Sequence, residues 1–222
     1  MLEHIIASNI RQHLDDHSIL SPFQHGFRKK HSCETQLLTT IEDLARGLDQ
    51  RDQIDCLILD FSKAFDSVAH QRLLYKMDWY GIRGKTNNWV KNWLTSRTQT
   101  VVVDGETSEE AEVISGVPQG TVLGPLLFIL YINDIAENTS STIRLFADDC
   151  LVYKNIKSQS DTTTLQEDLN TMANWSKKWQ MSFNPKKCTA PSCDKEETGH
   201  QPNLQYDGNQ PRPDGAPPIF RS

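Results

Sequence analysis

Two adjacent aspartates, Asp148 and Asp149, lie between the apolar segments 142–146 and 150–153. Apolar segments on either side of a short polar pair predict two strands joined by a tight turn. Asp is uncommon in strands, so an adjacent pair of aspartates at this place needs an explanation. Neighbouring carboxylates repel each other, and a divalent cation held between them relieves that repulsion. A hard cation such as Mg²⁺ takes oxygen ligands, often one or two carboxylates together with substrate phosphates. The pair therefore indicates a metal site, with a polar hairpin turn as the alternative.

A third carboxylate, Asp60, ends the short apolar run 56–59. Two hydrophobic strands that each end in an aspartate would bring Asp60 beside Asp148, despite the long stretch of chain between them. Asp66 competes with Asp60 as the ligand from this segment. Asp60 is preferred because it ends the strand, whereas Asp66 lies beyond residues 64–65, where it could cap a helix.

The elements that must position these acids follow from the periodicity. Apolar residues recur at helical spacing in several segments, and Ser32 is expected to cap one of these helices. A buried strand is predicted over 55–60, and a β-hairpin is predicted from 98–103 and 112–114 around Asp104-Gly105. The expected helices cover about 2–14, 33–48, 73–80, 87–94 and 123–132.

A further helix is expected after the aspartate pair. Thr164 and Glu167 form a capping-box pattern at its start. Its apolar positions include Trp175 and Trp179, which are expected to anchor the core rather than to stack on bases. From Pro191 onward the chain loses its periodicity and is expected to be disordered.

Four sequence blocks and a weaker fifth carry a resemblance to a known family. In chain order they are QHGFRKKHSC (24–33), LILDFSKAFDSV (57–68), SGVPQGTVLGPLLF (115–128), FADD (146–149) and, more weakly, FNPKKC (183–188). Together they resemble the reverse transcriptases of non-LTR, LINE-type (jockey-like) retrotransposons. The resemblance covers most of the chain up to about residue 188.

The resemblance implies an α+β fold with a ferredoxin-like palm sheet and helical fingers, as in right-hand polymerases. It implies a reverse transcriptase domain over 1–190 and a disordered or non-homologous tail over 191–222. Neither a helical thumb nor an endonuclease is expected in this sequence, which is interpreted as a retrotransposon fragment. Within the domain, the fingers would cover about 1–54 and 70–117, and the palm about 55–69 and 118–190.

The activity implied by the resemblance is RNA-directed DNA polymerisation. A primer 3′-hydroxyl would attack the α-phosphorus of a deoxynucleoside triphosphate, and pyrophosphate would leave. Asp60, Asp148 and Asp149 would hold two Mg²⁺ ions, with Mn²⁺ as a possible substitute. The implied partners are an RNA template, a DNA primer and deoxynucleoside triphosphates.

The resemblance also implies roles for five other residues. Lys187 would protonate the leaving pyrophosphate, with the adjacent Lys186 as the alternative. Arg28, with or without Lys30, would grip the triphosphate through its forked donors. Phe65 would exclude a 2′-hydroxyl, although it could equally be a core phenylalanine. Gln119 and Gly120 would lie beside the nascent base pair, with a simple turn before a helix as the alternative.

Composition adds three constraints. The net charge of −6 argues mildly against nucleic-acid binding, although residues 28–30 form a local basic cluster. Five scattered cysteines predict reduced thiols, and Cys188, Cys193 and His200 have no regular metal-site spacing. No signal peptide or membrane-spanning run is evident, so the protein is expected to be intracellular, in nucleus or cytoplasm, and not secreted.

Three rival functions remain at this point. The same residues would be present in a catalytically inactive retroelement remnant. A binding module could hold RNA through the basic segment without any chemistry. A metal-dependent phosphohydrolase is a third possibility, but the chain lacks the histidine-rich ligand set expected of one.

Overall fold

The structure, a computed structural model, describes residues 2–190, 192–193, 205–206 and 220–221. The chain forms two compact units, and each is built from two separate stretches of sequence. Unit 1 comprises Met1–Leu20 and Lys63–Ile132, and unit 2 comprises Ser21–Ser62 and Asn133–Ser222. These boundaries differ from those of the fingers and palm, whose division stays a prediction. The tail expected to be disordered lies mostly outside the described residues.

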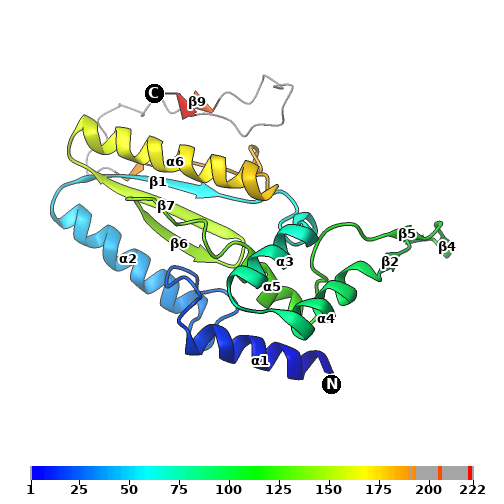
Figure 1. Cartoon of the computed structure of the whole chain (residues 1–222). Helices are drawn as coiled ribbons and strands as arrows, with labels where there is room; N and C mark the ends of the chain where they lie inside the picture. Colours follow the sequence, from blue (N-terminus) through cyan, green and yellow to red (C-terminus); the bar gives the residue numbers. More distant parts are fainter. Residues whose placement is uncertain (1, 191, 194–204, 207–219, 222) are drawn as a thin grey trace. The chain divides into compact units, whose positions relative to one another are not determined.

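Unit 1 is largely helical, and its most buried element is α5, in which eight of nine residues are buried. Helix α5 contacts both α1 and α3, and α3 also packs against α4 (Figure 1). The four helices and one short 3₁₀ helix are α1 (Leu2–Asp16), η1 (Phe65–Ser67), α3 (His70–Trp79), α4 (Gly84–Thr95) and α5 (Leu123–Tyr131). The helices expected in these four regions are confirmed. No helix in the described part of the chain combines the length and apolar character needed to cross a membrane.

The predicted hairpin of unit 1 is confirmed as two short antiparallel ladders. Strand β2 (Thr98–Gln99) pairs with β5 (Ala111–Glu112), and β3 (Val102–Val103) pairs with β4 (Glu106–Thr107). Asp104 and Gly105 have φ angles of 52° and 88°. Positive φ at both central residues is what a two-residue type I′ hairpin turn requires, and Asp-Gly is one of its preferred sequences.

Unit 2 contains a four-stranded sheet in the order β6-β7-β1-β8. Its strands are β1 (Gln53–Leu59), β6 (Thr142–Phe146), β7 (Asp149–Ile156) and β8 (Ser192–Cys193). All three pairings in the sheet are antiparallel. A separate short ladder joins β9 (Gln205–Tyr206) and β10 (Phe220–Arg221).

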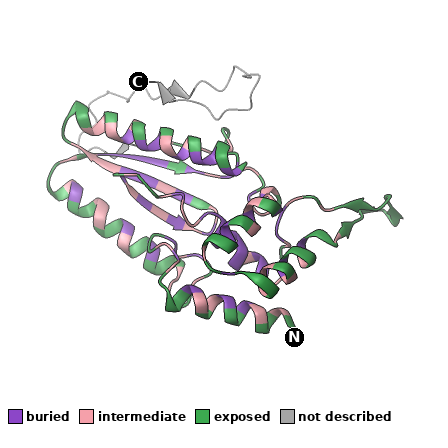
Figure 2. Ribbon diagram, in the orientation of Figure 1, coloured by how far each residue is buried: buried purple, intermediate pink, exposed green. Residues whose placement is uncertain are grey.

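The sheet of unit 2 lies between two helices, α2 (Cys33–Asp49) and α6 (Gln159–Trp179) (Figure 1). Strand β1 is mostly buried, β6 and β7 mix buried with partly buried residues, and both helices keep exposed outer faces (Figure 2). On the α2 side, Leu44 and Leu48 pack against a core cluster of Ile54, Cys56 and Tyr153.

Helix α2 begins as the sequence predicts. Ser32 is its N-cap, and its hydroxyl accepts a hydrogen bond from the backbone N–H of Thr35. The Thr35 hydroxyl in turn accepts a bond from the Ser32 N–H. This reciprocal capping box satisfies two backbone donors that would otherwise have no partner at the helix start.

Helix α6 begins six residues earlier than predicted, so the expected capping box of Thr164 and Glu167 is wrong. The N-cap is Ser158, and Asp161 accepts hydrogen bonds from both the N–H and the hydroxyl of Ser158. Thr164 lies inside the helix, where its hydroxyl bonds to the carbonyl of Ser160. Ser158 with Asp161 and Thr164 with Glu167 both have the spacing of a helix start, and the first of these pairs caps the helix. The expected burial of Trp175 and Trp179 is confirmed.

Replacing Ser158 by alanine should therefore destabilise the protein by about 1 kcal/mol, the usual cost of losing an N-cap side chain. Thr164→Ala is the matched control, because the sequence predicted Thr164 as the capping residue of this helix. That substitution should change the free energy of unfolding by less than about 0.5 kcal/mol. Urea denaturation of both variants tests the assignment, which is wrong if Thr164→Ala has the larger effect.

Candidate metal and catalytic site

The pairing of β1 with β7 brings acids from remote parts of the sequence to one end of the sheet. Leu59 pairs with Cys150, and Phe146 pairs with Asp149 across the β6–β7 turn. Continuing the first ladder by one residue places Asp60 opposite Asp149. Since side chains alternate between faces along a strand, both carboxylates belong to the face that α2 covers further along.

That face of the sheet is open next to the acids. Ile54 and Cys56 are buried under α2, but Ile58, next on the same face, is 43% exposed. Asp60 follows two residues later at the end of the strand. The uncovered part of the sheet therefore begins where the acids lie, which leaves them accessible to a ligand.

A segment near the end of the described chain lies along the other edge of β1 and adds a cation. Asn184 donates its N–H to the Asp60 carbonyl at 2.7 Å. The following turn is closed by a bond from the Lys187 N–H to the Asn184 carbonyl. As a result the Lys187 Nζ lies 2.9 Å from Asp60 Oδ2. It is thus Lys187, and not the adjacent Lys186, that has an ion pair with the acid.

The electrostatics show that negative charge is in excess here. Partial desolvation raises the pKa of Asp149, and the carboxylates of Asp148 and Asp60 raise it further, while the Lys187 ammonium opposes them. The hydrogen bond to Asp60, together with its charge, raises the pKa of Lys187. A single ammonium thus faces three carboxylates.

The donors at this site suit a hard divalent cation, because all three are carboxylates. In the geometry described, however, Asp60 is paired with Lys187. Among the residues that the structure describes, no three His, Cys, Asp or Glu side chains are grouped closely enough to hold a metal ion. For the three carboxylates to share a cation, they would have to move closer together.

Arg28 also belongs to unit 2, but its guanidinium is engaged within its own loop. It donates to the carbonyls of Ser21 and Gln24 at 2.6 and 3.3 Å. These bonds stabilise the loop that precedes α2. The expected contact of Arg28 with a triphosphate stays a prediction.

Phe65, Gln119 and Gly120 belong to unit 1. The half-buried ring of Phe65 stacks on Phe128, with 4.5 Å between ring centroids and 12° between ring planes. Gly120 has a φ of 74° in the turn before α5, and the exposed Gln119 lines a cavity of about 520 Å³. Phe65 is thus part of a ring stack and yet only partly covered, so its role as a sugar gate stays a prediction.

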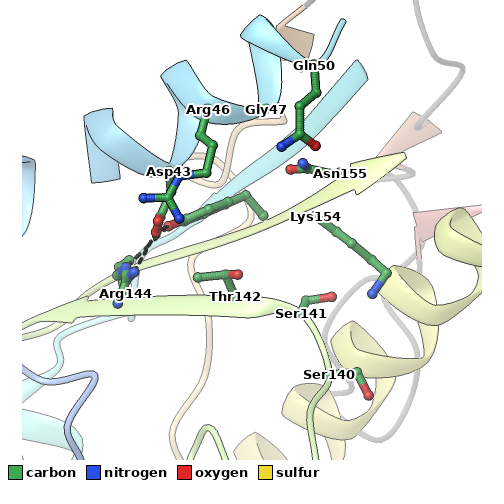
Figure 3. Close-up of a pocket in the computed structure, with 11 residues that line it drawn as sticks. Asp43, Arg46, Gly47, Gln50, Ser140, Ser141, Thr142, Arg144, Lys154 and Asn155 are labelled. Atoms are coloured by element: carbon green, nitrogen blue, oxygen red, sulfur yellow. Dashed lines mark hydrogen bonds and ion pairs between the residues drawn. The ribbon is translucent and has the colours of Figure 1, made fainter. Parts of the chain in front are cut away.

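A second cavity, of about 450 Å³, lies in unit 2 where α2 crosses β6 and β7 (Figure 3). Asp43 on α2 accepts hydrogen bonds from Arg144 and from the Tyr153 hydroxyl, both at 2.5 Å. Burial alone would raise the pKa of Asp43, but these two bonds outweigh it and hold that pKa below its ordinary value. The network ties α2 to the sheet.

Gln24 contacts the aspartate turn, and its sequence pattern did not predict this contact. Its side chain is buried and bonds to the backbone of Ala147, next to Asp148. It belongs to the first of the family blocks, but nothing in its neighbouring residues indicates a contact with a segment more than a hundred residues away.

Comparison with known proteins identifies the family of this chain. Residues 1–208 match the family described as reverse transcriptase (RNA-dependent DNA polymerase). The chain belongs to the reverse transcriptase family. The match extends beyond residue 190, where the sequence predicted the domain to end.

Two relatives of this chain come from mobile elements of Drosophila melanogaster. The RNA-directed DNA polymerase from mobile element jockey is 32% identical over 197 residues, covering 85% of this chain and 21% of the relative. The probable RNA-directed DNA polymerase from transposon BS is 29% identical over 204 residues, covering 85% of this chain and 22% of the relative. The chain thus spans about a fifth of the length of these relatives.

Solved telomerases share the fold. The telomerase of Candida tropicalis, determined with a fragment of telomeric RNA, has a TM-score of 0.64 at 12% identity, covering 90% of this chain and 35% of that one. The corresponding complex from Candida albicans gives a TM-score of 0.62 at 12% identity, covering 91% and 36%. The mixed helix-and-sheet architecture is therefore one that this chain shares with these telomerases.

The crowding of carboxylates predicts a pH-dependent effect of Asp149→Asn. Because the pKa of Asp149 is raised on folding, the folded state binds a proton more readily than the unfolded state, whose Asp pKa is about 3.9. The contribution of this group to stability therefore falls as the pH rises above that value. The asparagine variant should be more stable at neutral pH, on the order of 0.5 kcal/mol because solvent screens the charge.

Near pH ~3 the difference should vanish, since the carboxyl group is then protonated in both states. Urea denaturation at the two pH values, without divalent metal, measures the effect. Asp104→Asn is the matched control, because it removes one exposed negative charge in a turn where asparagine tolerates the positive φ. Equal stabilisation by the two variants would show that only the net charge matters.

Proposed function

We propose that this reverse transcriptase chain carries out RNA-directed DNA synthesis, in which a primer 3′-hydroxyl attacks the α-phosphorus of a deoxynucleoside triphosphate. The observation that carries the proposal is the arrangement of acids in unit 2. Asp60 follows β1 at the same end of the sheet as Asp148 and Asp149, and Lys187 is paired with Asp60. The names of the relatives and the RNA in the telomerase complexes support an RNA template as partner.

Asp60 and Asp148 are proposed as the principal metal ligands, with Asp149 supporting them. Two Mg²⁺ ions, or Mn²⁺ in their place, would activate the primer hydroxyl and neutralise the charge of the leaving oxygens. The contribution of the protein is mainly to position charge, as in other phosphoryl transfers. Lys187 is the ammonium paired with Asp60, and we assign to it the protonation of the leaving pyrophosphate.

A ferredoxin-like palm is supported by the order of elements. The elements β1, α5, β6, β7, α6 and β8 occur along the chain in the β-α-β-β-α-β order of that fold, with η1, α3, α4 and the strands β2 to β5 inserted between β1 and α5. The two outer strands in space, β6 and β8, are the second and fourth along the chain. This strand order suits a palm whose first and third strands lie together in the centre and carry the acids.

The substrate contacts proposed for the remaining residues follow from their chemistry. The partly exposed ring of Phe65 would exclude a 2′-hydroxyl, and the exposed amide of Gln119 would bond a sugar or base edge beside Gly120. Arg28 could bind a phosphate oxygen while it keeps both carbonyl partners, because those two bonds come from Nη1 and the guanidinium has five N–H donors.

Asp60→Asn and Asp148→Asn should each reduce primer extension on poly(rA)/oligo(dT) with Mg²⁺ or Mn²⁺ by a factor of about 10³ or more, since each removes a ligand charge that the transition state needs. Asp66→Asn is the matched control, because Asp66 is exposed and belongs to the same sequence block. It should leave extension nearly unchanged. Robust extension by Asp148→Asn would refute the assignment.

The same assay separates the rival functions. A wild-type chain that binds RNA tightly in a salt-dependent way, and keeps that binding in both variants without any extension, would be a binding module. A folded wild-type chain with neither activity would be an inactive remnant.

Phe65→Ala should raise the ratio of ribonucleotide to deoxynucleotide incorporation by about 10- to 100-fold, because it removes the bulk that excludes the 2′-hydroxyl. Loss of the ring stack with Phe128 also lowers stability, but a ratio measured on one enzyme is independent of the folded fraction. Phe65→Tyr keeps the ring and should keep the wild-type preference. An unchanged sugar preference in Phe65→Ala would leave this residue a role in the core only.

A further inference from the structure

The Gln24 side chain makes two hydrogen bonds to the turn that carries the aspartates and one to its own loop. Its Oε1 accepts from the N–H of Gly26 at 2.7 Å and from the N–H of Ala147 at 2.9 Å. Its Nε2 donates to the carbonyl of Ala147 at 3.0 Å. The residue is only 2% exposed. The amide therefore satisfies both backbone polar groups of the residue that precedes Asp148.

The turn itself needs this support. The β6–β7 ladder closes with Phe146 opposite Asp149, so the turn consists of Ala147 and Asp148 alone. Ala147 has a φ of 54°, in the left-handed region that glycine usually occupies in two-residue hairpin turns. An alanine there does not favour the turn by itself, so the conformation depends on bonds from outside the hairpin.

The backbone around Gln24 is fitted to the same place. His25 donates its N–H to the Leu145 carbonyl at 2.8 Å, and the Leu145 N–H bonds to the Phe23 carbonyl at 2.9 Å. A Cβ on Gly26 would lie 2.2 Å from the Ala147 nitrogen. Glycine is therefore required at position 26 for the loop to approach the turn this closely.

We propose that Gln24 is a positioning residue, whose side-chain amide holds the Ala147–Asp148 turn in the conformation that presents the Asp148 and Asp149 carboxylates to a divalent cation. The consequence for catalysis rests on the proposed function, whereas the hold on the turn stands on the contacts alone. Partners that orient metal ligands in this way commonly change metal affinity by 10- to 100-fold when they are removed.

The chain supplies a matched control in Gln36, a second buried glutamine of unit 2. Gln36 lies on α2 and is 9% exposed, and its Oε1 has no hydrogen-bond partner. Replacing either glutamine by methionine removes a buried amide and leaves a side chain of similar size and shape. Gln24→Met alone removes the bonds to the aspartate turn.

The test uses the full chain and two readouts. Backbone hydrogen exchange, followed at the amides of Ala147 to Cys150, should accelerate about tenfold or more in Gln24→Met, since the Ala147 N–H loses its acceptor. Mn²⁺ binding, measured by the loss of the free-ion electron paramagnetic resonance signal, should weaken about tenfold or more. Gln36→Met should match the wild type in both.

Gln24→Glu provides a second, milder variant in case Gln24→Met does not fold. Its carboxylate still accepts from Gly26 and Ala147 but places an oxygen against the Ala147 carbonyl, where the amide donated. It should keep the slow exchange of the Ala147 N–H and still weaken Mn²⁺ binding more than Gln36→Met does. Wild-type exchange and wild-type Mn²⁺ affinity in either folded Gln24 variant would overturn the proposal.

These outcomes are distinct from failure of the proposed function. A wild-type chain that extends no primer, yet binds Mn²⁺ in a manner that depends on Gln24, would support the positioning role and refute the polymerase activity. Primer extension that is normal in the wild type and unaffected in Gln24→Met, with unchanged exchange at the turn, would support the polymerase activity and refute the positioning role.

Discussion

The antiparallel pairing of β1 with β7, in one particular register, is the constraint on which the rest of unit 2 depends. It places the end of β1 opposite the start of β7, and so gathers carboxylates from two distant segments. A slip of one residue would turn Asp60 toward the opposite face of the sheet from Asp149. The register is fixed by burial on both faces, with Cys56 and Tyr153 beneath α2, and Leu57 and Val152 buried on the side of α6.

At this site, the carboxylates that would bind a metal also repel one another when no metal is present. Three carboxylates lie near the Lys187 ammonium, and the pKa of Asp149 is raised first by partial desolvation and then by repulsion from Asp148 and Asp60. An assembly of this kind stabilises a metal-bound state at the expense of the metal-free one. The overall charge of −6 therefore says little about binding nucleic acid, because the function depends on where the charges lie rather than on their sum.

Local patterns predicted much of this architecture. Helical periodicity located α1 to α5, alternation and turn residues located both hairpins, and an aspartate at the end of an apolar run singled out Asp60. The start of α6 was missed because two cap-like patterns lie six residues apart, and sequence alone does not say which one forms. Sequence also could not separate Lys187 from Lys186, since only the turn at Asn184 decides which side chain reaches the acid.

Contacts between remote segments were beyond any local pattern. The bonds of Gln24 to Ala147 and of Asp43 to Arg144 each join residues about a hundred positions apart. Neither residue type is unusual where it occurs, so only the folded chain shows what they do.

The interleaving of the two units bears on how this protein is made. The stretches of the two units alternate along the chain, so unit 1 is complete only after Ile132 has been made, and unit 2 only after its second stretch has followed. Strand β1 emerges early, whereas β7 follows only after all of Lys63–Ile132 has been translated. A nascent chain that stalls in between carries β1 as an unpaired, apolar strand, which is a template for aggregation.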